Sequence, residues 1–453
     1  MNSDARILAF AGLLLAAAPA VADEAASAWS GGLDLRLREV AIENANALDE
    51  DNASASRHFE RYRVRGWGRY AANDVLALTG RLMWEGRHYY RPGESAHYET
   101  WYDGALMFDN LYLDVAKPGG LPVNFRIGRQ EIMFGNGWLT GDGTPLDGSR
   151  SFYLDAARAT WAKAADTVDV VLVRQDAKTS LTLDGEREDQ TEQDERGLIA
   201  YWRHKAGPDT DLDAFFIRKN NSPVSGEAGA GSLRLNNGFI IPVAADPSDD
   251  GHVNALGGRV ESALTARWKA RAEAAFEWGR RNGKDLQAYG FNGRLTRRLD
   301  GERAARVQIG YEFLSGDDPD STGKTEAFDP LWGRWPQWSE LYGPYSYGAE
   351  TRTGETTNLH RLNLGWAVKV HPTTELSLDY HALFADRNSK CGSTGFSCSD
   401  KFRGHLLAAW LRSKFDKHVA GHLVAEYFIP GGYYTPPKGD NAYFLRAELV
   451  LSW

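Results

Sequence analysis

The residues of this sequence that could do chemistry are arginines that recur in short alternating runs. Most share a phase with other polar residues, opposite a row of apolar side chains. The candidates are Arg36, Arg38, Arg61, Arg63, Arg65, Arg81, Arg126, Arg129, Arg158 and Arg361, with Arg306 and Arg446 in later runs. A guanidinium stays charged at neutral pH and pairs two carboxylate oxygens through its planar fork. The set therefore predicts a surface that attracts carboxylates.

A second interpretation of the same arginines is structural. Acidic residues occupy the same phase, namely Asp34, Glu85, Asp114, Glu273, Glu277, Glu312 and Asp379. Ion pairs between the two sets would brace a wall and leave no cation free for a ligand. Both interpretations stay open for each arginine. Arg129 has a further problem, because it falls on the opposite phase from Arg126 unless Gly128 or the following loop provides a bulge.

The sequence lacks the common catalytic patterns. It contains no G-x-S-x-G, H-E-x-x-H or C-x-x-C motif, and His88, His97 and His381 are scattered along the chain. The net charge of −9 argues against nucleic-acid binding. The sequence therefore predicts neither an enzyme, nor a resident metal or other cofactor, nor a nucleic-acid partner.

The runs that carry the arginines alternate with a period of two. In residues 109–116 one face carries Leu111, Leu113 and Val115, and the other carries Asn110, Tyr112 and Asp114. Alternation of this kind is typical of a β-strand, because successive side chains leave opposite faces of the backbone. A soluble sheet would bury the apolar face and expose the charges. A transmembrane barrel reverses this arrangement, with lipid outside and polar side chains in the lumen.

About eighteen such runs follow one another, and their connections alternate between long and short. The long ones are 42–56, 88–103, 135–153, 175–195, 219–252, 279–285, 315–355, 387–402 and 429–440. Short periplasmic turns and longer outer loops are the rule for outer-membrane barrels. The sequence therefore predicts an all-β fold, a single transmembrane antiparallel up-and-down β-barrel of about 18 strands with both termini in the periplasm.

The two ends of the chain support export to an outer membrane. Residues 1–22 combine Arg6, an apolar stretch and an Ala-Val-Ala site, as in a secretory signal. We therefore expect a signal peptide over 1–22 and the barrel over 23–453. The last run ends in an aromatic residue and has one face made of Tyr443, Leu445, Ala447, Leu449, Leu451 and Trp453, which resembles the strand read by the barrel-insertion machinery. We expect the bacterial outer membrane as the location, with its lipid and lipopolysaccharide as partners.

Two of the predicted outer loops contain residues of interest. The loop 315–355 is long enough to fold into the barrel as a plug or to lie over its mouth. Its aspartates offer Ca²⁺ ligands, but without the spacing of an EF-hand. Cys391 and Cys398 lie seven residues apart in the loop 387–402, a spacing that fits a disulfide in an exported protein.

Three blocks within 109–161 resemble the alginate-export family of outer-membrane porins. They are the YLDVA strand at 112–116, FRIGRQEIMFGNG at 125–137 and LDAARATW at 154–161. The resemblance implies a monomeric eighteen-stranded barrel with an arginine-lined constriction that passes an anionic polysaccharide. It also maps Arg126, Arg129 and Arg158 onto the pore. The alternatives are an uptake porin for small carboxylates or sugars, and a structural barrel closed by its loops.

Overall fold

The computed structural model describes residues 28–45, 47–52, 56–91, 100–141, 153–185, 187–191, 193–223, 231–234, 240–243, 249–333, 338–343 and 356–453. The expected signal peptide at 1–22 lies outside these ranges. No helix in the described ranges is long and apolar enough to cross a membrane.

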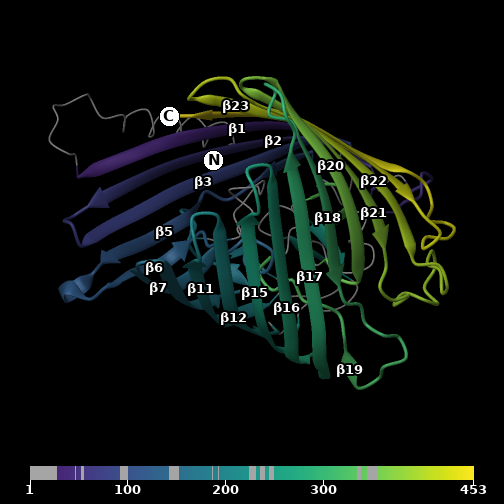
Figure 1. Cartoon of the computed structure of the whole chain (residues 1–453), viewed down its shortest axis with the longest axis horizontal. Helices are drawn as coiled ribbons and strands as arrows, with labels where there is room; N and C mark the ends of the chain where they lie inside the picture. Colours follow the sequence, from purple (N-terminus) through teal and green to yellow (C-terminus); the bar gives the residue numbers. More distant parts are fainter. Residues whose placement is uncertain are drawn as a thin grey trace.

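Eighteen long strands form one closed antiparallel barrel (Figure 1). Their bounds are β1 Trp29–Glu43, β2 Arg57–Ala71, β3 Leu76–Arg91, β5 Met107–Ala116, β6 Val123–Gln130, β7 Leu154–Lys163, β8 Asp166–Gln175, β11 Asp194–Lys205, β12 Thr210–Ser222, β15 Gly251–Ala263, β16 Trp268–Arg281, β17 Lys284–Arg298, β18 Arg306–Leu314, β20 Leu359–His371, β21 Thr374–Phe384, β22 Phe402–Lys414, β23 Val419–Pro430 and β24 Ala442–Ser452. The barrel closes because β1 pairs with β2 on one side and with β24 on the other. The predicted fold class is confirmed.

The side chains of the wall are arranged as the alternation predicts. Outward-facing Leu172, Leu256 and Ile309 are 59%, 57% and 53% exposed, although each lies inside a strand. The neighbouring inward-facing positions hold buried polar residues such as Glu273 and Glu312. A sheet with an apolar exposed face and a polar buried face fits a barrel whose outer surface contacts lipid and whose lumen contains water or protein.

The structure contradicts one of the predicted long loops, the one expected over 279–285. β16 ends at Arg281 and β17 begins at Lys284, so only Asn282 and Gly283 connect them where the sequence analysis expects a loop over 279–285. Both residues have positive φ, at 52° and 81°. Asn-Gly is the preferred pair for a two-residue hairpin whose twist matches that of its strands. The strict alternation of long and short connections therefore fails at this outer turn.

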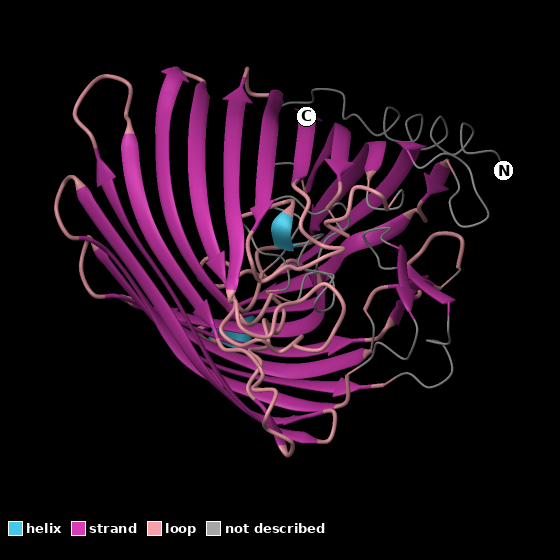
Figure 2. Cartoon of the chain, turned by 90° about the vertical axis from the view of Figure 1, so that its right-hand side faces the viewer, coloured by secondary structure: helices cyan, strands magenta, loops and turns pink. Residues whose placement is uncertain are grey.

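Short strands and loops complete the structure. β4 (Trp101–Asp103) adds to the edge of β3, and β19 (Lys324–Thr325) pairs in parallel with β17. The hairpins β9–β10 (Lys178–Thr179, Glu188–Asp189) and β13–β14 (Gly231–Arg234, Ile240–Val243) stand apart from the main sheet. Figure 2 shows loops lying between the walls of the barrel, which makes the lumen a partly filled space.

The exposed apolar face predicts how the barrel tolerates charge. We expect Leu256→Arg to destabilise the folded barrel by about 2–4 kcal/mol, because Leu256 lies near the middle of the lipid-facing band. Leu264 is similarly exposed at 59% but lies in the periplasmic turn after β15. Leu264→Arg should therefore cost only about 0–1 kcal/mol. Folding into lipid vesicles during urea titration measures both, and equal losses would contradict the assigned lipid face.

Candidate functional site

The arginines predicted in the first two strands lie on the lumen face, where they contact carboxylates of the same wall. The ion pairs are Arg63–Asp34 at 3.2 Å, Arg65–Asp34 at 2.7 Å, Arg61–Glu85 at 3.3 Å, Arg36–Glu85 at 3.6 Å, and Arg38–Glu448. Arg36, Arg38 and Arg63 are 3–4% exposed. This cluster thus braces the wall, which is the structural interpretation that the sequence left open.

The next predicted arginines are paired in the same way. Arg81 donates to both oxygens of Asp109, at 2.7 and 2.9 Å. Arg126 donates to Asp114 at 2.7 Å and lies over the Tyr112 ring, and Arg158 donates to Asp169 at 2.8 Å. Each of these arginines therefore has a carboxylate partner on a neighbouring strand.

Arg129 does not belong with the lumen arginines, which corrects its predicted placement at the pore. It shares a face with Ile127, and the ladder between β5 and β6 continues across Gly128 without a shift of register. The guanidinium is buried at the end of β6, where it donates to Asp155 at 2.8 Å and to Thr179 at 2.9 Å and lies over the Tyr153 ring. Gly128 has a φ of +124° but adds no residue to the strand, so the bulge that would turn Arg129 inward is absent at this position.

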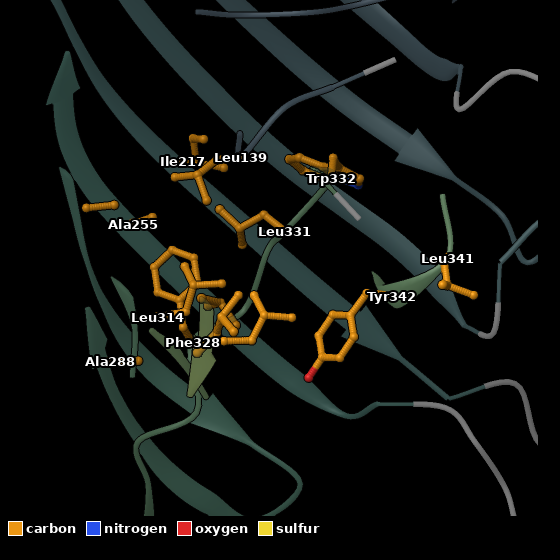
Figure 3. Packing of buried hydrophobic residues seen from close by; sticks show 14 of the residues in the cluster. Leu139, Ile217, Ala255, Ala288, Leu314, Phe328, Leu331, Trp332, Leu341 and Tyr342 are labelled. Atoms are coloured by element: carbon orange, nitrogen blue, oxygen red, sulfur yellow. The ribbon is translucent and has the colours of Figure 1, made fainter. Parts of the chain in front are cut away.

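Two loops fold into the barrel. The described parts of 131–140 and 326–343 meet there, since Thr140 and Trp332 pair as a β-bridge. Figure 3 shows Phe328 and Leu331 among the buried side chains Ile217, Ala255 and Leu314 of the wall. Of the two positions that the sequence analysis considers for the loop 315–355, its described part adopts the inserted one.

A wall carboxylate, Glu426 on β23, holds one end of the inserted loop. It accepts hydrogen bonds from Ser339 Oγ at 2.5 Å, from the Glu340 amide at 2.8 Å and from the Leu341 amide at 3.1 Å. Hydrogen bonds to a charged group are worth about 1.5–3 kcal/mol each. Glu426 is therefore the main anchor of this part of the loop.

A second anchor lies on β11 and β12. Lys219 Nζ donates to the Leu331 carbonyl at 3.1 Å and pairs with Glu195 at 3.0 Å. Glu195 also accepts a hydrogen bond from the Trp332 indole N–H at 2.9 Å. The buried Lys219 and Glu195 side chains thereby form hydrogen bonds with the carbonyl and indole N–H groups of the loop, in place of hydrogen bonds to water.

A third anchor involves Asp329 within the loop. Its amide donates to Glu277 at 2.8 Å, and its carboxylate lies 3.6 Å from Arg281. Burial opposes ionisation of Asp329, but the nearby charges of Arg281 and Lys219 outweigh it, so the pKa of Asp329 lies below its ordinary value. The loop therefore carries an ionised carboxylate toward the basic residues of the wall.

A cavity of about 460 Å³ remains between the inserted loops and one side of the barrel, β16 to β22. Its arginines are Arg271, Arg294, Arg306, Arg361 and Arg412, and its tryptophans include Trp138, Trp338 and Trp410. Of the candidate arginines named from the sequence, Arg306 and Arg361 line this cavity. Arg271, Arg294 and Arg412 are not among those candidates, because phase alone does not tell which side of a barrel the loops leave open.

The cavity arginines differ in their partners. Arg306 pairs with Glu375 at 2.6 Å, and Arg361 pairs with Glu312 at 2.9 Å. Arg271 and Arg294 lie directly opposite each other on β16 and β17. Within the described part of the chain, neither makes an ion pair or a side-chain hydrogen bond with a carboxylate. Two adjacent guanidiniums have the charge and the planar forks that pair with an anion, and Glu312 and Asp379 line the same cavity.

The remaining predicted sites lie in the outer loops. Cys391 and Cys398 form a disulfide, which closes a small turn in the connection between β21 and β22. Among the described residues, no group of three or more His, Cys, Asp or Glu side chains could hold a metal ion.

Comparisons with known proteins agree with the fold. A family model described as "Alginate export" matches residues 30–439. OccAB2 of Acinetobacter baumannii is 8% identical, with 94% of this chain and 98% of that chain covered and a TM-score of 0.57. OccK7 (OpdD) of Pseudomonas aeruginosa is 11% identical, with 93% and 99% covered and a TM-score of 0.55. At these identities the likeness shows the fold alone. No curated protein matches the sequence.

The Glu426 anchor predicts how the inserted loop behaves when it is loosened. We expect Glu426→Ala to raise the frequency of high-conductance openings in planar bilayers about tenfold or more, because it removes charge-assisted hydrogen bonds that hold the loop in place. Glu261→Ala is the matched control, since Glu261 contacts Arg259 and Lys269 of the wall and no part of the loop. The same frequency of high-conductance openings in both variants would contradict the anchoring role of Glu426.

Proposed function

Because the chain belongs to the alginate export family of outer-membrane porins, we propose that its barrel passes anionic polysaccharide, or related acidic carbohydrate, passively through the lumen. The family and the barrel fold place the protein in the bacterial outer membrane. Passage would follow the cavity that the inserted loops leave open beside β16 to β22.

The observation that carries this proposal is the Arg271–Arg294 pair in the cavity wall. Most lumen arginines lie within 4 Å of a carboxylate, although Asp34, Glu85 and Glu448 are each shared by two or three arginines. The pair makes no ion pair with a carboxylate in the described part of the chain, and Arg306, Arg361 and Arg412 extend the basic surface along the same side. A row of moderate anion sites suits conduction, because each must bind weakly enough to release the solute to the next.

A second candidate is the passage of small carboxylates or single sugars. The observation that favours it is the narrowing of the lumen by two loops, which leaves a cavity of about 460 Å³ beside them. A flexible polymer and a small acid would meet the same arginines. They differ in length, and therefore in whether a long chain can occupy the passage and block the flow of salt.

The arginine pair predicts the ion selectivity. In planar bilayers under a salt gradient, we expect Arg271→Gln with Arg294→Gln to lower the anion-to-cation permeability ratio by about fivefold, because two unneutralised charges leave the path. Arg280→Gln with Arg297→Gln is the matched control, since both arginines are exposed on the outward face of β16 and β17 and neither lines the cavity. An unchanged anion-to-cation permeability ratio in the Arg271→Gln, Arg294→Gln variant would contradict the assignment of this pair as the selective site.

The same recordings separate the candidates. Block of the wild-type current by a uronate polymer, weaker in the arginine-pair variant, supports passage of acidic polysaccharide. Block by small acids alone supports the second candidate. A barrel without conductance would be structural, and would overturn both.

A further inference from the structure

Trp338 of the inserted loop has a fixed position in the cavity wall. The Arg361 guanidinium carbon lies 4.7 Å from the centroid of the indole, and the His381 ring lies 5.3 Å from it. The next residue, Ser339, is held by Glu426. Trp338 also stacks on Tyr342, with ring centroids 5.9 Å apart, and it lines the cavity. An indole fixed by these contacts presents its cavity-lining part as a rigid apolar platform.

His381, beside this platform, presents a hydrogen-bond donor. Arg361 can only donate, so its hydrogen bond to His381 Nδ1 at 3.2 Å makes Nδ1 the acceptor and places the ring proton on Nε2. His381 is 2% exposed, and its Nε2 makes no hydrogen bond within the described part of the chain. A buried donor left in this state is costly unless a ligand group accepts from it. Since His381 lines the cavity, a hydroxyl oxygen there could be that acceptor.

The platform and the arginine pair lie on one continuous strip of wall. Arg271, Arg294, Arg361 and His381 belong to β16, β17, β20 and β21, with only β18 between β17 and β20. Four strand spacings of roughly 4.8 Å make a strip of about 19 Å along the wall. A single sugar ring is too small to reach both ends, so the strip fits a short oligosaccharide.

We propose that this strip is a saturable site for an acidic oligosaccharide, in which Trp338 stacks on a sugar ring while Arg271 and Arg294 hold carboxylates. The proposal rests on the proposed function and adds a criterion for selection, the sugar ring in addition to the charge. An acyclic polyanion offers the arginines their carboxylates but offers Trp338 no ring. A neutral oligosaccharide offers the ring but no carboxylate.

The test is isothermal titration calorimetry on the purified full-length barrel in detergent, with three probes. These are trigalacturonate, N-acetyl-triglutamate amide as an acyclic trianion, and cellotriose as a neutral trimer. We expect wild-type protein to bind trigalacturonate about tenfold more tightly than either other probe, because stacking and charge pairing act together. Trp338→Ala should remove the preference for trigalacturonate over the acyclic trianion, and Trp338→Phe should keep most of it.

Trp202→Ala is the matched control, since Trp202 is an exposed residue of the outer face. It should bind all three probes as the wild type does. Heat-modifiable migration in gels reports folding of each variant. Equal binding of the uronate and the acyclic trianion by the wild type would overturn the proposal, as would a preference that survives Trp338→Ala.

Bilayer recordings keep this test separate from that of the proposed function. Trp338→Ala leaves the arginine pair in place, so its anion preference should stay within about twofold of the wild type. Anion selectivity without a ring preference would overturn the saturable site and leave the proposed passage standing. Ring-dependent binding in a barrel without conductance would do the reverse.

Discussion

The structure depends on the requirement that charge inside a membrane be either paired or hydrated. A closed barrel satisfies its backbone by pairing every strand with two neighbours, so its side chains are free to divide between lipid and lumen. The lumen side of this barrel holds many arginines at low exposure, and burying a charge without a partner is costly. Most therefore pair with a carboxylate on an adjacent strand, as Arg63 and Arg65 do with Asp34.

That requirement explains what the sequence could reveal. The period of two identified the strands, the lipid-facing rows and the closed fold, because those features follow from the local alternation alone. The same period places Arg126 and Arg158 opposite the lipid-facing rows, and each pairs with a carboxylate of a neighbouring strand. The Asn282-Gly283 turn was readable as well, since the pair favours a two-residue hairpin. Its misassignment as part of a longer loop came from expecting the connections to alternate strictly in length.

The site was harder to predict from the sequence. The alternation shows which face of a strand a residue lies on, whereas the cavity depends on where distant loops enter the barrel. Arg36 and Arg271 have the same phase in their strands, yet Arg36 is braced in the wall and Arg271 faces open space. The difference arises from loops distant in sequence, which enter the barrel and fill part of it. Arg129 illustrates a complementary error. Similarity to a family block suggests a pore position, whereas the unshifted register keeps Arg129 in phase with Ile127 and its side chain contacts Asp155, Thr179 and Tyr153.

The anchors of the inserted loop and the arginine pair of the cavity are two consequences of the same pairing rule. Glu277 and Glu426 are wall carboxylates without an arginine salt bridge in the described structure, and they bind amides of the loop instead. Arg271 and Arg294 are the counterpart, cations for which the wall supplies no paired carboxylate. These two acids bind protein inside the barrel, while the cavity that stays open is lined by Arg271, Arg294, Arg306, Arg361 and Arg412 together with Glu312 and Asp379. The net charge of −9 of the whole chain does not describe this surface, because the local position of charges, and not their sum, sets the field that a solute meets.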